Sequence, residues 1–173
     1  MLGRKIPPST YGTLTPIEVN EPFKMVGWDL MGLFPTSIQG NKYILVITKC
    51  LTYWCEVVAL PDATLNMDTV ANALLQGVIF PHQILSGQGS QFWSDVMKVL
   101  TQSLGIKQLF ALSYRPKTNN LTKRMNKTIK EIIIAYVDPL HQWWDQVLSF
   151  TMHTYNTSVH GSTRVSPLRA FYG

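Results

Sequence analysis

After a proline-rich start, the chain carries short apolar runs at the spacing of β-strands. Residues 25–34, 43–48 and 54–60 are rich in valine, isoleucine and aromatic side chains. Gln39-Gly40-Asn41 follows the first run and Leu51-Thr52-Tyr53 follows the second. This pattern predicts three successive strands that pair antiparallel, preceded by an extended lead-in over residues 1–24.

From Leu65 onward the apolar positions recur with helical spacing, and a first helix is expected over residues 65–78. Short strands are predicted at residues 83–85 and 106–111, with a helix between them that ends at Gly105. A longer helix is expected from about residue 121 to Tyr136. Its two sides differ, because Met125, Ile129, Ile132, Ile133 and Tyr136 share one side, whereas Lys123, Lys127 and Lys130 share the other.

A last long helix is expected to turn its large apolar residues inward, namely Trp143, Trp144, Val147, Leu148 and Tyr155. Ser166-Pro167 predicts the start of a short final helix. The order of elements predicts an α/β domain over residues 25–173, with a mixed five-stranded sheet flanked by helices. Many such folds bind or cut nucleic acid and many do neither, so the pattern alone leaves function open.

Composition adds little to this picture. The 173 residues suit one domain, and 15 Lys+Arg against 10 Asp+Glu give a net charge of +5, which mildly favours polyanionic partners. No run approaches the ~20 apolar residues of a membrane span, so we expect a soluble, intracellular protein. Cys50 and Cys55 are expected to be reduced, buried thiols, because a zinc site needs more ligands nearby.

Three stretches carry a family resemblance. Residues 22–32 with 43–47 form the first, and Leu85-Ser86-Gly87-Gln88-Gly89-Ser90-Gln91-Phe92 forms the second. The third covers residues 114–130, and Tyr155-Asn156 fits the same pattern near the end. Together they resemble the integrase catalytic core of Ty3/gypsy retrotransposons and retroviruses, in order and at similar spacing. The resemblance implies an RNase H-like fold.

The departures from the family pattern concern its metal-binding acids. Asp29 matches the first catalytic aspartate, but Gly87 and Lys123 stand at the second and third acidic positions. Two-metal phosphoryl transfer uses carboxylates to hold two Mg²⁺ about 4 Å apart. The family's three acids supply roughly −3 of charge to these hard cations, whereas the three residues here carry no net charge. We therefore expect an inactive domain with no metal cofactor.

Two interpretations of the vacated site remain open. In the first, Lys123 fills the vacated metal site and pairs with Asp29. In the second, Asp29 is exposed to solvent without a function and Lys123 points to water. No other acid replaces the lost ones, because Asp95 and Glu131 lie two helical turns beyond Gly87 and Lys123.

Candidate nucleic-acid contacts follow from the place of the family's DNA-binding helix: Arg115, Lys117, Asn119, Lys123, Arg124, Lys127 and Lys130. Such a stripe neutralises phosphates, although it is also what an ordinary solvated helix face looks like. The resemblance further implies DNA as partner, a homodimer through helices, and nuclear localisation. No membrane and no small-molecule substrate are expected. The alternatives are a Mg²⁺-dependent integrase or nuclease with unrecognised ligands, and a domain that binds proteins only.

Overall fold

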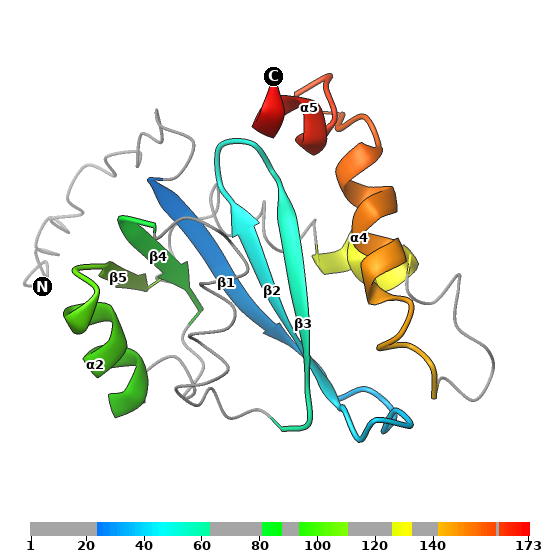
Figure 1. Cartoon of the computed structure of the whole chain (residues 1–173), viewed down its shortest axis with the longest axis horizontal. Coiled ribbons are helices and arrows are strands. Elements are labelled where there is room, and N and C mark those ends of the chain that lie inside the picture. The colour runs from blue at the N-terminus through cyan, green and yellow to red at the C-terminus, as the bar shows by residue number, and fades with distance from the viewer. Residues whose placement is uncertain (1–23, 63–80, 88–93, 111–125, 133–141, 162) are drawn as a thin grey trace, which may run out of the picture.

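The chain forms a mixed five-stranded sheet with helices on both faces (Figure 1). The computed structural model describes residues 24–62, 81–87, 94–110, 126–132, 142–161 and 163–173. The strands are β1 (Met25–Met31), β2 (Tyr43–Lys49), β3 (Cys55–Leu60), β4 (Gln83–Ser86) and β5 (Lys107–Phe110). Each predicted strand is therefore confirmed, and the first ends at Met31 rather than residue 34.

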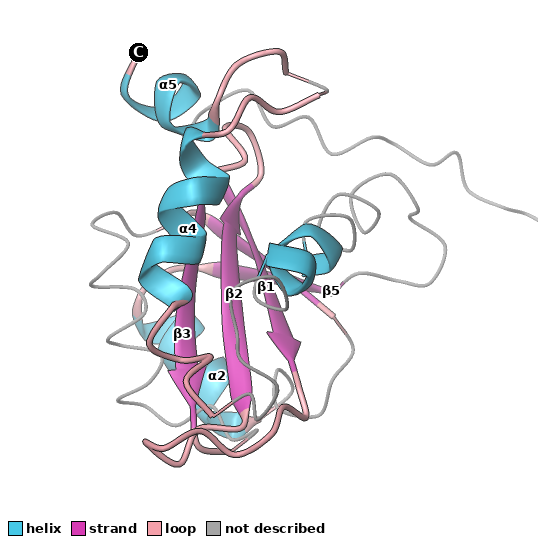
Figure 2. Ribbon diagram, turned by 90° about the vertical axis from the view of Figure 1, so that its right-hand side faces the viewer, coloured by secondary structure: helices cyan, strands magenta, loops and turns pink. Residues whose placement is uncertain are grey.

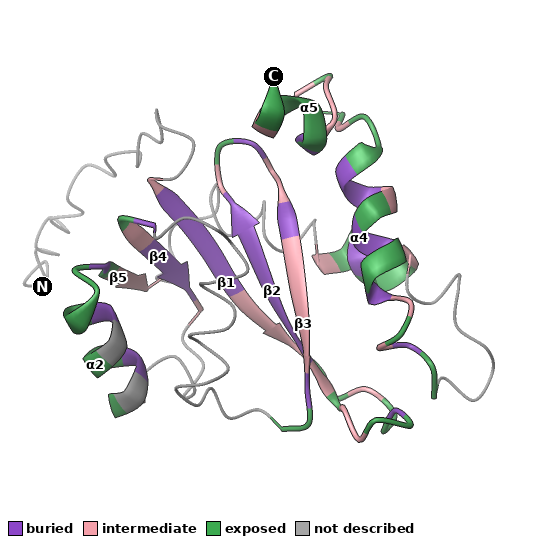
Figure 3. Ribbon diagram, in the orientation of Figure 1, coloured by how far each residue is buried: buried purple, intermediate pink, exposed green. Residues whose placement is uncertain are grey.

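Strand order in the sheet is β3-β2-β1-β4-β5. The first three strands pair antiparallel, as their short turns require, while β4 and β5 run parallel to β1. The central strands β1 and β2 carry most of the buried residues of the sheet (Figure 3). This order places β1, and with it Asp29, in the middle of the sheet.

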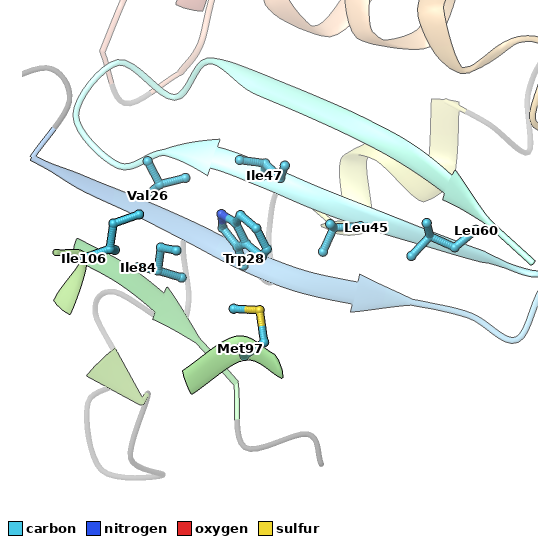
Figure 4. Close-up of a cluster of buried hydrophobic side chains, with 8 residues drawn as sticks. All are labelled: Val26, Trp28, Leu45, Ile47, Leu60, Ile84, Met97 and Ile106. Atoms are coloured by element: carbon cyan, nitrogen blue, oxygen red, sulfur yellow. The ribbon is translucent and has the colours of Figure 1, made fainter. Parts of the chain in front are cut away.

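Alternation along the strands sends side chains to two separate cores. On one face Trp28, Leu45 and Ile84 pack with Met97, which reaches them from helix α2 (Asp95–Ser103) (Figure 4). On the other face Ile44 and Val46 pack against Ile129, in the helical residues 126–132, and against helix α4 (Leu148–Thr157). Figure 2 shows α4 standing in front of the β3 side of the sheet.

The local helix signals are confirmed where the structure describes them. Gly105, with φ +65°, follows α2 in the left-handed conformation that glycine adopts without strain. Ser166 caps the short helix α5 (Pro167–Tyr172), since its Oγ accepts a hydrogen bond from the Arg169 N–H at 3.2 Å. The helix expected over residues 65–78 lies outside the described residues. No described helix is long and apolar enough to cross a bilayer.

The expected start of the last long helix is wrong. Residues 142–147 form turns, and α4 begins at Leu148. Trp144 is buried, at 1% exposed, but Trp143 is 48% exposed and does not face the core. Helical periodicity placed both tryptophans inward, whereas a turn sends consecutive side chains in different directions.

Candidate functional site

The retained carboxylate, Asp29, sits half-buried on β1 and is held by an amide. Its Oδ1 accepts a hydrogen bond from the Leu30 backbone N–H at 3.0 Å. Its Oδ2 accepts one from the side-chain Nδ2 of Asn126, at the start of the helical residues 126–132. Trp28 and Leu30 face the α2 side, so Asp29 faces the side of that helical segment. Both carboxylate oxygens of Asp29 are therefore already engaged by neutral donors.

Gly87 lies beside Asp29 at the end of the neighbouring strand. Trp28 pairs with Ser86 in the parallel β1–β4 ladder, so Asp29 and Gly87 are the next residues along the two strands. A Cβ at Gly87 would meet no atom within 4 Å. The described residues therefore leave room for a Cβ at this position, where glycine has no side chain to offer as a ligand.

Four of the other described acids are used elsewhere. Asp145 accepts hydrogen bonds from Ser37 Oγ (2.5 Å) and Asn41 Nδ2 (2.8 Å). Glu56 Oε1 lies 3.4 Å from Lys49 Nζ and accepts from Trp54 Nε1 at 2.8 Å. Asp95 and Glu131 pair with the nearby lysines of their own helical segments. Within the described ranges, no group of three His, Cys, Asp or Glu side chains could hold a metal ion.

The helical residues 126–132 expose lysines on one side, as predicted, but one of these lysines is paired with an acid. Lys127 and Lys130 are exposed and Ile129 is buried, as their spacing predicts. Lys127 Nζ, however, lies 3.7 Å from Glu131 Oε1, so part of its charge is balanced by a neighbour on the same surface. Arg115, Lys117, Asn119, Lys123 and Arg124 lie outside the described residues, so the choice between the two interpretations of Lys123 stays open.

Known proteins resemble this chain both in sequence and in structure. The chain is 28% identical over 155 residues to human "Gypsy retrotransposon integrase-like protein 1", covering 87% of this chain and 29% of that protein. It is 24% identical over 164 residues to the Transposon Tf2-3 polyprotein of Schizosaccharomyces pombe, covering 91% of this chain and 12% of the polyprotein. The chain thus spans less than a third of either relative. No family model matches it.

The structural match is closer than the sequence identities suggest. The HTLV-2 integrase catalytic core domain, solved in complex with magnesium in a trimeric form, superposes with a TM-score of 0.69 at 18% identity, covering 87% of this chain and 97% of that one. The chain has the fold of an integrase catalytic core. This RNase H-like fold and the Ty3/gypsy relatives confirm the resemblance drawn from the motifs.

Asn126 is the residue of the site whose role the sequence left undefined. Asparagine is common in loops and at helix caps, so the residue type alone does not predict a contact with Asp29. In the structure it donates to Asp29 across 97 positions of chain. The signal available beforehand was its place three residues after Lys123, since residues at that separation share a helix face.

The two thiols take no part in the site. Cys50 is half-buried and Cys55 fully buried, and both are free. Burial raises the pKa of the Cys50 thiol to about 11. Burial, and then the adjacent Glu56 carboxylate, also raise the pKa of the Cys55 thiol. Both remain neutral thiols near pH 7, which are poor nucleophiles and poor metal ligands.

Proposed function

We propose that this domain is a catalytically inactive integrase core that serves as a nucleic-acid-binding and self-association module. The observation that carries the proposal is that Asp29, which matches one of the family's three acids, has both carboxylate oxygens in hydrogen bonds. An asparagine amide donates to its Oδ2, and the neighbouring strand ends in Gly87 instead of a second acid. One carboxylate, already hydrogen-bonded, supplies too few oxygen ligands and too little negative charge to hold two Mg²⁺ ions.

Positive charge supports the nucleic-acid part of the proposal. The chain has a net charge of +5, and Lys127 and Lys130 project from the same helical segment that supplies Asn126. Exposed lysines bind phosphates without reading base sequence, and they bind more weakly as salt rises. The expected interaction is therefore with the DNA backbone, close to the vacated metal site.

Salt-dependent DNA binding tests this. A fluorescent duplex of about 20 base pairs, titrated by anisotropy, is expected to bind with a dissociation constant of about 10⁻⁶–10⁻⁴ M near physiological salt. Lys130→Gln is expected to weaken binding and to reduce the slope of log K against log salt by about 0.9. Lys98→Gln is the matched control, since Lys98 is an exposed lysine on α2 that pairs with Asp95. Binding that ignores salt, or equal effects of both variants, would contradict the assignment.

Exposed apolar side chains support the self-association part. Trp143, in the turn before α4, is 48% exposed, and Phe150, near the start of α4, is 52% exposed. Large aromatic residues at a surface are more typical of interfaces than of a solvated face. We infer a homodimer in which this end of α4 contributes to the contact.

A further inference from the structure

Glu131 lies beside the lysines that the proposed function assigns to DNA binding. In the helical residues 126–132, drawn in yellow in Figure 1, Lys127, Lys130 and Glu131 are exposed, whereas Ile129 is buried against the sheet. At about 100° per residue, Lys127 lies between the other two, about 60° from Lys130 and about 40° from Glu131. The acidic side chain therefore borders the basic surface next to Lys127, and Lys130 lies on the far side of that lysine.

The two lysines differ in how far their charge is balanced. Lys127 Nζ lies 3.7 Å from Glu131 Oε1. Within the ranges that the structure describes, no acid forms an ion pair with Lys130. Lys130 therefore presents its full positive charge to a phosphate, whereas Lys127 presents a charge that Glu131 partly offsets.

The Lys127–Glu131 pair contributes little to the stability of the helix. Both side chains are largely exposed, at 77% and 64%, and the separation of 3.7 Å is too long for a hydrogen bond. The lysine precedes the glutamate by four residues, which is the less favourable order for such a pair in a helix. Water screens exposed pairs, and many of them add nothing measurable to stability. The main consequence of Glu131 is therefore its effect on anions that approach Lys127.

We propose that Glu131 limits the affinity of this surface for nucleic acid, because it competes with phosphate for Lys127. This inference rests on the DNA-binding function proposed above. A phosphate in contact with Lys127 lies within about 7 Å of the Glu131 carboxylate, which is inside the screening length of about 8 Å at physiological salt. Such a phosphate must displace the carboxylate from Lys127 and is repelled by it. Lys130 is left as the stronger phosphate contact of the segment.

Variants matched in charge test the proposal on the full chain, with the same fluorescent duplex of about 20 base pairs as the probe. Glu131→Gln is expected to tighten binding about 3-fold at about 50 mM salt, because Lys127 is released and one repulsive charge is removed. The gain is expected to shrink at about 300 mM salt, where the screening length falls to about 5–6 Å.

Asp95→Asn is the matched control for net charge. Asp95 pairs with Lys98 on α2 at 3.1 Å, and this substitution also removes one negative charge from an exposed ion pair. It is expected to leave the dissociation constant within about 1.5-fold of the native value, because net charge alone acts weakly beyond the screening length. All of these exposed substitutions are expected to change the melting temperature by no more than about 2 °C.

Lys127→Gln completes a double-mutant cycle with Glu131→Gln. It is expected to weaken binding about 2-fold in the native chain and about 5-fold in the Glu131→Gln background, because only there is the lysine released from its partner. In a chain that lacks Lys127, the gain from Glu131→Gln is expected nearly to disappear.

Equal effects of Glu131→Gln and Asp95→Asn overturn the proposal, as does a gain from Glu131→Gln that persists in full without Lys127. If either result is found while Lys130→Gln still weakens binding, the DNA-binding function stands and only the role of Glu131 is wrong. Salt-dependent binding that is absent from every variant overturns both.

Discussion

Replacing Trp144 with alanine is expected to lower the free energy of unfolding by about 3–5 kcal/mol, the range for removal of a buried tryptophan. Trp144 is 1% exposed and lies in the core between the sheet and α4. Its Nε1–H donates to the Pro35 carbonyl at 2.7 Å, and its ring lies 5.1 Å from that of Phe34. The substitution therefore creates a cavity, removes an aromatic contact and leaves a carbonyl without its donor.

Thermal or urea unfolding measures this loss, at about 2–4 °C of melting temperature for each kcal/mol in a domain of this size. Trp143→Ala is a matched control one residue away. Because Trp143 is 48% exposed, its replacement is expected to change stability by no more than about 0.5 kcal/mol. Equal losses at the two positions would show that the turn before α4 is placed wrongly.

Replacing Asn156 with alanine is expected to cost about 2–4 kcal/mol, because two buried backbone groups lose their partners at once. The Asn156 amide binds both the N–H and the carbonyl of Cys55, and it joins α4 to the start of β3. Asn156 itself is 5% exposed, so water does not readily replace the amide.

The matched variant is Asn156→Asp, which keeps an acceptor for the Cys55 N–H but loses the donor to its carbonyl. It is expected to destabilise as well, with the slowed amide exchange of Cys55 partly kept. Urea unfolding and hydrogen exchange at Cys55 measure the two effects. Unchanged stability in Asn156→Ala would mean that α4 does not depend on this clamp.

Much of the fold follows from local pattern. The strands are apolar runs bounded by turn residues, and the caps at Gly105 and Ser166 act over one helical turn. Trp143 was misplaced because spacing alone cannot tell a helix from a series of turns, in which consecutive residues take different directions. Local sequence therefore predicts the elements better than the orientation of residues at their ends.

The site was only partly predictable, because its contacts join distant parts of the chain. Asp29 and Gly87 could be identified from the motifs, and the β1–β4 pairing brings them to neighbouring strand ends. The hydrogen bond from Asn126 to Asp29 and the clamp of Asn156 on Cys55 depend on tertiary packing. The place of β1 in the middle of the sheet depends on strand order, which no local pattern specifies.

The central proposal is that this integrase-core-like domain binds no catalytic metal, and thermal melting with and without millimolar Mg²⁺ or Mn²⁺ at matched ionic strength tests it most directly. A ligand that binds only the folded state must raise the melting temperature. A double variant, Gly87→Asp with Lys123→Glu, restores both family acids and serves as the positive control, since Gly87 has room for a side chain. The account predicts no shift in the native chain and a rise in the double variant. A clear rise in the native chain that Asp29→Ala abolishes would contradict it.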